Sequence, residues 1–490
     1  MAKTKNWKCG LSRWQASSLF VGSVFLLLTL ISAPDAQAAG DSWEAVGSDP
    51  YLSDTSHGTP SLAFHPTNHH LYVAIVENAD SIQVKHFDGT AWENVGSAVT
   101  SGELDYAKIA FNPETKELYL AYWDITLHKI VVQKYDGSSW VDVGSHGVTE
   151  NDGSRLSFAF NPSTGNPYLA YEDRTISKLV VKMFNGSSWE NVGSNGLSND
   201  NASYISLAFD PSSNQPYVSF ADSGNGHKVR VIKYNGSSWE DVGPLGVSSG
   251  SGSYTDLAFN PETDLPYVVY TDNDDNYSLK LKRFDGSAWQ DVGNPMGDDP
   301  YGFEGQIAFC PSTNLLHVAY LNNEALHDLV VKKYNGSSWE LVGSKGFNTN
   351  FGFYMDFGFQ PSTNEPYAIY EDQEEGALLN HLAIYKFNKA VSNHSTMNYA
   401  RKKSTKRNVV FTFRDLKITT KKAWVKAWLG GKKVKVKAAK RSGDNLKVTM
   451  QVKYGKWSRK SYNLRMEFKK KVGKRTHTDT WRSTNVLTIL

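Results

Sequence analysis

Carboxylates and tyrosines recur along this sequence at positions that suit the binding of hydroxylated ligands. An acid ends an apolar segment at Glu77, Asp124, Asp173, Asp222, Asp272 and Asp372. Tyrosine recurs at a second position, at Tyr106, Tyr204, Tyr254 and Tyr354. Aromatic faces stack on sugar rings, and carboxylates accept hydrogen bonds from hydroxyl groups. The two sets therefore predict a carbohydrate-binding surface. In the alternative, structural interpretation the acids cap turns and the tyrosines pack between elements.

These positions belong to an internal repeat of 48 to 50 residues. A tryptophan followed by x-x-Val-Gly marks each copy, at Trp43, Trp92, Trp140, Trp189, Trp239, Trp289 and Trp339. The other recurring segments are short, rich in Val, Tyr, Phe and Leu, and bounded by turn residues, which predicts four short strands per copy. A large ring at the same place in every copy usually fills the gap between neighbouring sheets, so we expect a structural role for the tryptophans.

Four antiparallel strands at this period predict an all-β fold, a seven-bladed β-propeller. The tryptophan strands start one unit early, around Trp43, and none follows Phe387–Asn388. The N-terminal strand is therefore expected to complete the last blade and to cover two open sheet edges. In such a blade the loop between strands 2 and 3 and the loop into strand 1 emerge on one face. The acids and the tyrosines are expected on that face.

The repeat also resembles known proteins. Its motifs are Gly-Ser-Ser-Trp-x-x-Val-Gly, as at residues 137–144, and a Pro-Tyr-Val-Ala-Tyr-x-Asp-like segment, as at residues 167–173. Together they resemble secreted bacterial β-propeller repeat proteins over residues 42–388, which implies the fold and not an activity. The arrangement of repeats is similar to that of propeller lectins, and this resemblance implies a sugar site at each blade or blade junction. The turn at Asp136 resembles the Asp-box of sialidase-like propellers but departs from its Asp-x-Gly-x-Thr-Trp spacing, so no sialidase chemistry is implied.

Enzymatic and metal-binding motifs are few. A Gly-x-Ser-x-Gly match at residues 246–250 lies in a Ser/Gly-rich stretch and not on the strand-to-helix turn of a nucleophile elbow. Similar acids in nearly every repeat favour several weak sites strengthened by avidity over the single tuned carboxylate pair of a glycosidase. A hydrolase site in loops peculiar to one blade, such as residues 298–304, stays open. No cofactor is predicted. The alternative is Ca²⁺ at residues 272–276, although Tyr277 stands where an EF-hand loop needs Gly and Arg283 where it needs Glu.

The N-terminus predicts export. Basic residues precede an apolar stretch from Leu19 to Ala33 and a small-residue cleavage site at Ala36–Ala38, so residues 1–38 are expected to be a signal peptide, with an uncleaved anchor as the alternative. We expect a secreted or cell-surface protein. Cys9 lies in the signal and Cys310 stands alone in the mature chain, so no intramolecular disulfide is expected. A monomer is predicted.

The last part of the chain differs from the repeats in charge. Residues 401–490 carry 28 Lys plus Arg against four acids, whereas residues 39–400 carry 20 against 45. Alternating apolar and basic residues predict an immunoglobulin-like β-sandwich over residues 408–490, after a linker at 391–407 and a propeller at 39–390. Outward lysines predict polyanion binding, at Lys433, Lys435, Lys437, Lys447 and Lys453.

The predicted function combines these domains. We expect a non-enzymatic recognition or adhesion protein, whose propeller binds glycan or protein ligands multivalently. The basic domain is expected to bind an anionic cell-surface polymer or lipid headgroup, and extracellular DNA is an alternative partner. The charge has a second interpretation, in which it only aids solubility or pairs with the acidic propeller. The alternatives for the whole protein are a glycan-active hydrolase and a protein-interaction scaffold.

Overall fold

The structure is a computed structural model. It describes residues 42–47, 51–56, 58–297, 299, 301–322, 328–346, 351–373 and 380–388, and the backbone of strands between residues 395 and 489. The expected signal peptide lies outside these residues. Across the residues described, no helix has the length and apolar character needed to cross a membrane.

Five repeats each form a separate antiparallel four-stranded sheet, as the spacing predicts. In chain order the sheets are β8 (Leu104–Phe111), β9 (Leu118–Asp124), β10 (Lys129–Tyr135) and β11 (Trp140–Asp142); β12 (Gly153–Phe160), β13 (Pro167–Asp173), β14 (Lys178–Phe184) and β15 (Trp189–Asn191); β16 (Ala202–Phe209), β17 (Pro216–Asp222), β18 (Lys228–Tyr234) and β19 (Trp239–Asp241); β20 (Gly252–Phe259), β21 (Pro266–Asp272), β22 (Ser278–Phe284) and β23 (Trp289–Asp291); β24 (Phe303–Phe309), β25 (Leu316–Asn322), β26 (Asp328–Tyr334) and β27 (Trp339–Leu341).

The first and last repeats share one ten-stranded sheet. It contains β3 (Ser61–Phe64), β4 (Leu71–Glu77), β5 (Ser81–Phe87), β6 (Trp92–Asn94) and β7 (Val99–Thr100) from the first repeat, and β28 (Phe351–Phe359), β29 (Pro366–Gln373) and β30 (Asn380–Asn388) from the last. Strand β1 (Ser42–Ala45) pairs antiparallel with β30, so that Trp43 stands opposite Phe387. Strand β2 (Tyr51–Ser56) pairs with both β30 and β4. The expected pairing between the N-terminal segment and the last repeat is therefore confirmed.

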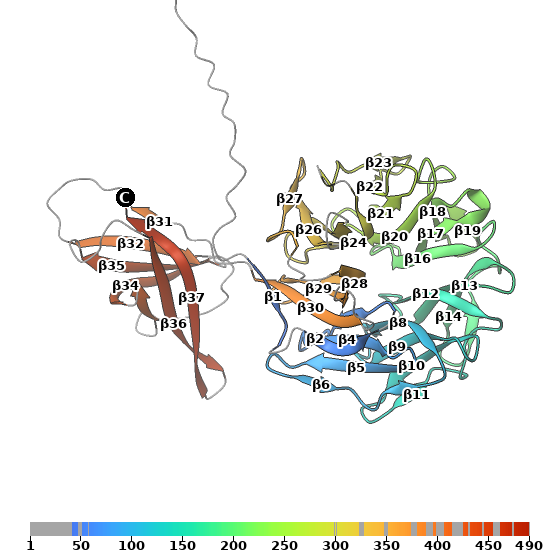
Figure 1. The fold of residues 1–490 in the computed structure, drawn as a ribbon, viewed down its shortest axis with the longest axis horizontal. Coiled ribbons are helices and arrows are strands. Elements are labelled where there is room, and N and C mark those ends of the chain that lie inside the picture. The colour runs from blue at the N-terminus through green and yellow to red at the C-terminus, as the bar shows by residue number, and fades with distance from the viewer. Residues whose placement is uncertain are drawn as a thin grey trace, which may run out of the picture. The chain divides into compact units, whose positions relative to one another are not determined.

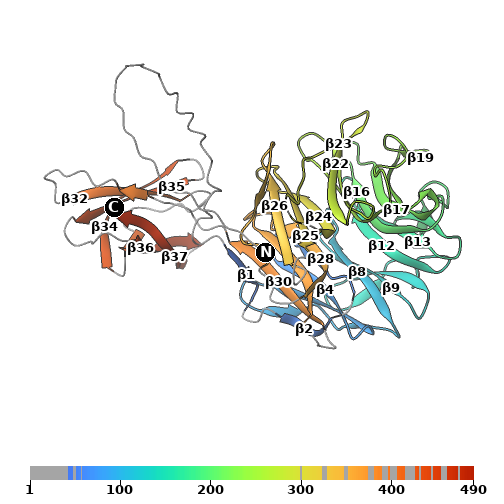
Figure 2. The same ribbon diagram turned by 45° about the horizontal axis from the view of Figure 1, so that its top comes forward.

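The sheets are the blades of a β-propeller. The first strands, such as β8, β12, β16, β20, β24 and β28, lie on the inside, and the fourth strands, such as β6, β11, β19, β23 and β27, lie on the outside (Figure 1). The view turned by 45° agrees (Figure 2). Each first strand contacts the first strand of the next repeat, and β28 contacts β3, which closes the circle. The apolar core lies between neighbouring blades, and strand 2 supplies its largest fully buried side chains, among them Tyr122, Tyr171, Phe220 and Tyr270.

The repeated tryptophans join each blade to the one before it. Each indole Nε1 donates a hydrogen bond to the carbonyl oxygen of the valine that follows the preceding fourth strand. The seven bonds measure 2.6 to 3.3 Å and run Trp43 to Val342, Trp92 to Val46, Trp140 to Val95, Trp189 to Val143, Trp239 to Val192, Trp289 to Val242 and Trp339 to Val292. These donors and acceptors form an unbroken cycle. The structural role expected for the tryptophans is confirmed.

A second set of bonds joins the innermost strands. Three residues before the terminal Phe of strand 1, a side-chain oxygen accepts a hydrogen bond from a backbone N–H of the next blade. The six bonds measure 2.8 to 3.2 Å and run Ile109 to Ser61, Leu207 to Ser157, Leu257 to Ser206, Ile307 to Asp256, Phe357 to Gln306 and Leu62 to Asp356. The second repeat carries Lys108 at this position, a side chain that donates hydrogen bonds and accepts none.

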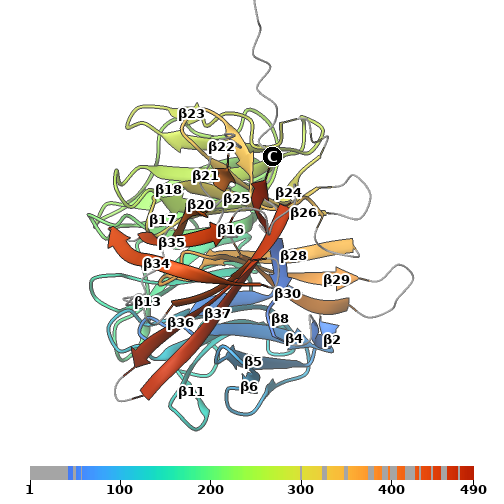
Figure 3. The same ribbon diagram turned by 90° about the vertical axis from the view of Figure 1, so that its left-hand side faces the viewer.

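The C-terminal strands form one hydrogen-bonded path of their own. They are β31 (Ser395–Met397), β32 (Lys406–Phe413), β33 (Val425–Leu429), β34 (Lys432–Ser442), β35 (Asn445–Lys453), β36 (Ser461–Val472) and β37 (Arg475–Ile489), in the order β31-β37-β36-β33-β34-β35-β32. Figure 3 shows β36 and β37 as two long neighbouring strands. The expectation of strands is confirmed, whereas the immunoglobulin-like sandwich stays a prediction. Strand β31 lies in the segment expected to be a linker.

Candidate ligand-binding site at the propeller mouth

A β-bulge interrupts the first strand of six repeats, β8, β12, β16, β20, β24 and β28. At each bulge one residue other than glycine has a left-handed backbone, with φ between 40° and 54°. These residues are Tyr106, Arg155, Tyr204, Tyr254, Glu304 and Tyr354. Such a backbone is uncommon outside glycine and costs about 1 kcal/mol or more at each position. We call this set the mouth cluster.

The mouth cluster contains all four tyrosines proposed from the sequence. Arg155 and Glu304 were not predicted from the sequence, because only the recurring tyrosines were considered at this position of the repeat. A signal for them did exist: like the tyrosines, both stand five residues before the terminal phenylalanine of strand 1, Phe160 and Phe309 respectively.

The side chains of the mouth cluster converge. The rings of Tyr204 and Tyr254 lie 4.6 Å apart between centroids. Burial raises the pKa of Tyr254, and the nearby Glu304, Tyr204, Tyr354 and Tyr106 raise it further, so residues from four other blades act on one hydroxyl group. Tyr204 and Tyr354 are 40% and 43% exposed, so the converging rings remain accessible.

Arg155 interacts with Tyr106 of the preceding blade and with an acid of its own blade. Burial and then Asp105 raise the pKa of Tyr106 to about 12, against an opposing hydrogen bond from the Arg155 side chain. The Arg155 Nη1 atom also donates a 2.8 Å bond to the buried Glu172 carboxylate. The one cation of the mouth cluster is therefore matched by an acid.

Two glutamates near the tyrosines hold protons more tightly than usual. Burial raises the pKa of Glu304 to about 7 and Glu371 adds to the rise, although backbone N–H groups of Tyr354 and Met355 oppose it. Burial likewise raises the pKa of Glu371 to about 7. Its carboxylate accepts 2.9 Å bonds from Ser56 and Asn380, which oppose that rise. Each group can therefore exchange a proton near neutral pH.

The acids that end strand 2 occupy different surroundings. Asp124, Asp173, Asp222, Asp272 and Asp372 are buried, and Glu77 is half-buried. Four of them accept hydrogen bonds from backbone N–H groups of the loop that follows, those of Leu127, Thr175, Gly224 and Asp274. Asp222 also binds the Arg230 guanidinium at 2.7 Å. These contacts match the turn-capping role that the sequence left open, and the acids shape the loops around the mouth.

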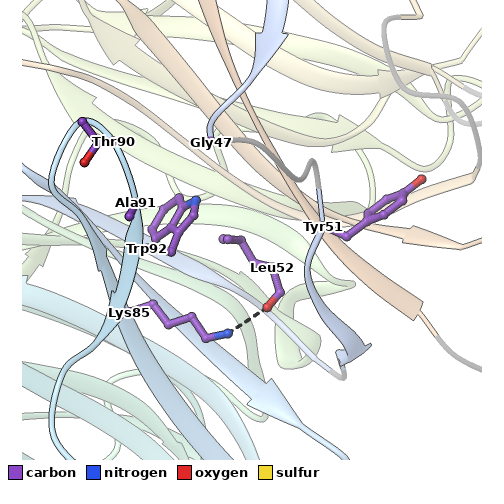
Figure 4. Close-up of a pocket in the computed structure, with 7 residues that line it drawn as sticks. All are labelled: Gly47, Tyr51, Leu52, Lys85, Thr90, Ala91 and Trp92. Carbon is purple, nitrogen blue, oxygen red and sulfur yellow. Dashed lines mark hydrogen bonds between the residues drawn. The ribbon is translucent and has the colours of Figure 1, made fainter.

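A pocket of about 280 Å³ lies where β1 and β2 meet the first blade. Figure 4 shows its lining, with Leu52 and the Trp92 ring forming an apolar wall. Its polar groups are already engaged, because Lys85 Nζ donates a 2.9 Å bond to the Leu52 carbonyl oxygen and the Trp92 indole binds Val46. The mouth cluster is therefore the stronger candidate.

The described residues hold no group of three or more His, Cys, Asp or Glu side chains placed to bind a metal ion. In the segment proposed as a Ca²⁺ alternative, Asp274 accepts a bond from the Ser251 backbone and Asp275 pairs with Lys280 at 2.5 Å. Cys310 is a buried free thiol.

No family model matches the sequence, and neither does any curated protein sequence. Among solved structures, the SapL1 lectin in complex with alpha methyl fucoside is 15% identical over 59% of this chain and 97% of its own, with a TM-score of 0.42. AofleA from Arthrobotrys oligospora is 13% identical over 63% and 91%, with a TM-score of 0.41. The Dos1 propeller is 10% identical over 66% and 76%, with a TM-score of 0.43. At these identities and scores, the function has to be argued from the site itself.

Proposed function

We propose that this chain is an exported recognition protein whose propeller binds carbohydrate at the mouth cluster. The observation that carries the proposal is the convergence of four tyrosines, two of them 40% and 43% exposed, with Arg155 and Glu304 on one axis. Tyrosine rings offer apolar faces to a pyranose, while the hydroxyl, guanidinium and carboxyl groups offer donors and acceptors to its hydroxyls.

The backbone of the cluster supports this assignment. Six left-handed residues outside glycine are costly to hold, and strained residues of this kind concentrate at ligand sites.

We also propose that the propeller has seven blades, with the ten-stranded sheet counted as two blades joined through β2. The support is the cycle of seven indole bonds, in which Trp43 provides the link from the N-terminal segment to Val342.

For the C-terminal strands we propose an immunoglobulin-like domain that binds an anionic polymer or lipid headgroup and retains the protein on a surface. The register supports polyanion binding. Lys406 stands opposite Lys453, and Lys440 stands opposite Lys447. Like charges directly opposite each other destabilise a sheet, and a bound polyanion relieves that repulsion. Secretion through the N-terminal signal and adhesion belong to the same proposal.

A hydrolase is the second candidate, because Glu304 and Glu371 both have pKa values raised to about 7 and Glu371 contributes to the raised pKa of Glu304. A glycosidase needs one carboxyl group that stays protonated near neutral pH as the general acid. Glu304 lies in the loop and strand region singled out from the sequence for this alternative.

A glycan array probed with the full-length protein tests these functions. Saturable binding without release of product, weakened by substitution of Tyr204 or Tyr354, is the expected result. Release of shorter glycans would favour the hydrolase instead. Failure to bind any glycan would overturn the carbohydrate proposal and favour a protein-interaction scaffold.

A further inference from the structure

The two faces of the C-terminal sheet differ in composition. Along β33 and β36 apolar residues stand opposite each other, in the pairs Val425 with Phe468, Ala427 with Met466 and Leu429 with Leu464. These pairs mark one face as apolar. Successive residues of a strand alternate between faces, so Trp428, between Ala427 and Leu429, belongs to the other face.

Basic residues flank Trp428 on that other face. Trp428 stands opposite Arg465 of β36 and opposite Lys433 of β34. Arg465 in turn stands opposite Arg482 of β37. Because residues opposite each other share a face, these four positions form one row across four strands, which we call the basic row. Neighbouring strands are about 4.8 Å apart, so the basic row is about 14 Å long.

The line of cations extends beyond these four strands. Lys453 of β35 stands opposite Lys406 of β32, and the register of β34 with β35 places Lys453 level with Lys433. None of the six positions in this line carries an acid. Two residues away on the same face, by contrast, Lys426 has Glu467 opposite it. The basic row therefore lacks an acid that could neutralise it within its own line.

An aromatic residue within a line of cations suits one class of polyanion. Arginine and lysine form charge-assisted hydrogen bonds with acidic groups, and a tryptophan ring offers a flat apolar face to a sugar. In an acidic polysaccharide, sugar rings and acidic groups follow one another along a single line. In a single-stranded nucleic acid the phosphates follow a basic groove while the bases stack on separate aromatic residues. Trp428 in the middle of the cations therefore fits the polysaccharide better.

We propose that the basic row binds a linear acidic polysaccharide, with one sugar ring on Trp428 and the acidic groups of the neighbouring sugars on Arg465 and Lys433. This inference rests on the proposed polyanion-binding function of the C-terminal strands and names its ligand class. It also explains why Arg465 and Arg482 can stand opposite each other, since a bound polyanion offsets the repulsion between like charges.

Calorimetry on the full-length protein tests the proposal with three probes. They are the octamer of α-1,4-linked galacturonic acid, the methyl ester of that octamer, and linear octaphosphate. The first probe has rings and charges, the second has rings without charges, and the third has charges without rings. We expect the galacturonic acid octamer and octaphosphate to bind in a manner that depends on Arg465, and any binding of the ester to be independent of Arg465 and Trp428.

Variants of Trp428 isolate the contribution of the ring. Trp428→Ala should weaken binding of the galacturonic acid octamer by about three- to tenfold, the size of one aromatic contact. The same variant should leave octaphosphate binding unchanged, because octaphosphate has no ring to stack. Trp428→Tyr keeps an aromatic ring and should retain most of the affinity for the octamer.

Variants of β36 isolate the contribution of the charge. Arg465→Gln should weaken binding of both anions and reduce the slope of the logarithm of affinity against the logarithm of salt by about one. Lys470→Gln is the matched control, because Lys470 lies on the same strand but on the opposite face, in register with His477. It should change the affinity for neither anion.

The outcomes are distinct. Failure of both anions to bind would overturn the polyanion function and this inference with it. Binding of both anions that Trp428→Ala weakens equally, or not at all, would keep the polyanion function and overturn the polysaccharide. Dependence on Trp428 for a thymidine octanucleotide or for phosphatidylglycerol vesicles, and not for the galacturonic acid octamer, would assign the basic row to nucleic acid or lipid. Unchanged binding in every variant, with a lowered melting temperature of the propeller, would mean that the acidic propeller covers the basic row.

Discussion

The indole nitrogen of Trp43 donates a 2.9 Å hydrogen bond to the carbonyl oxygen of Val342, 299 residues further along the chain. Trp43 also stands opposite Phe387, and their rings lie 5.5 Å apart. The N-terminal strand therefore makes the same junction at the end of the propeller that six other tryptophans make within it.

Replacing Trp43 with phenylalanine should lower the free energy of unfolding by about 1–3 kcal/mol, because the variant leaves the Val342 carbonyl oxygen without this donor. Urea denaturation measures the change. Trp189→Phe, which removes the equivalent bond to Val143 inside the chain of blades, should lower the free energy by a similar amount. If Trp189→Phe lowers the free energy of unfolding and Trp43→Phe leaves it unchanged, the N-terminal strand does not hold the propeller closed.

Lys108 interrupts the inner set of bonds, so Lys108→Ser should stabilise the propeller. Serine at this position in three other repeats accepts a bond from the next blade, with Leu207 bound to Ser157 at 3.0 Å as an example. The corresponding donor for residue 108 is the Phe158 backbone N–H. We expect a gain of about 0.5–1.5 kcal/mol in thermal or urea unfolding. Lys116→Ser, in an exposed turn, is the control. A loss of stability in Lys108→Ser, with no change in Lys116→Ser, would show that Lys108 has a stabilising role of its own.

Stability should fall as the pH rises through the window set by Glu304. The pKa of this carboxyl group is raised to about 7 in the folded chain from an ordinary value of 4.5. Below pH 4.5 both states carry the proton, and above pH 7 both have lost it. Between these values only the folded state holds the proton, so the folded state becomes less favourable as the pH rises.

Glu304→Gln removes this effect. The variant should gain up to about 3 kcal/mol relative to the natural chain at pH 8 and little at pH 4, as followed by urea denaturation at both values. Glu371, Tyr254 and Tyr354 face the same group, so Glu371→Gln should show a change of the same sign. A gain that is identical at both pH values would contradict a raised pKa for Glu304.

Retention of the full-length protein on heparin should weaken steeply with salt, because binding of lysines to a polyanion releases counterions. Lys435→Gln and Lys447→Gln should each reduce the slope of the logarithm of affinity against the logarithm of salt by about one. Lys116→Gln in the propeller is the control. Retention that is insensitive to salt would contradict the electrostatic role of the C-terminal strands.

The repeat spacing was enough to predict most of the fold. Trp43 and its six counterparts mark the fourth strands, and their early start predicted the pairing of β1 with β30. Two features of strand 1 were not predicted, because the residue type at these positions varies between repeats while the backbone geometry stays the same. Arg155 and Glu304 occupy the same bulge as the tyrosines, and Ser61, Gln306 and Asp356 occupy the same inner position.

The left-handed backbone of the mouth cluster could not be predicted from the sequence. Glycine and asparagine are the residues that signal such a backbone, and tyrosine argues against it. The burial of the acids that end strand 2 could not be predicted either. The alternation of apolar and polar residues along a strand does not distinguish a carboxylate that faces solvent from one that accepts hydrogen bonds from its own loop. Asp222, which accepts bonds from Gly224 and Arg230, is an example.

The position of β30 bears on how the propeller would resist mechanical force. Strand β30 ends at Asn388, and it pairs with β29 along one side and with β1 and β2 along the other. Tension applied from the C-terminal side would therefore act on an interior strand. The hydrogen-bond ladders on both sides of β30 would have to break together before this strand could separate from the sheet. An edge strand under the same tension would peel one bond at a time.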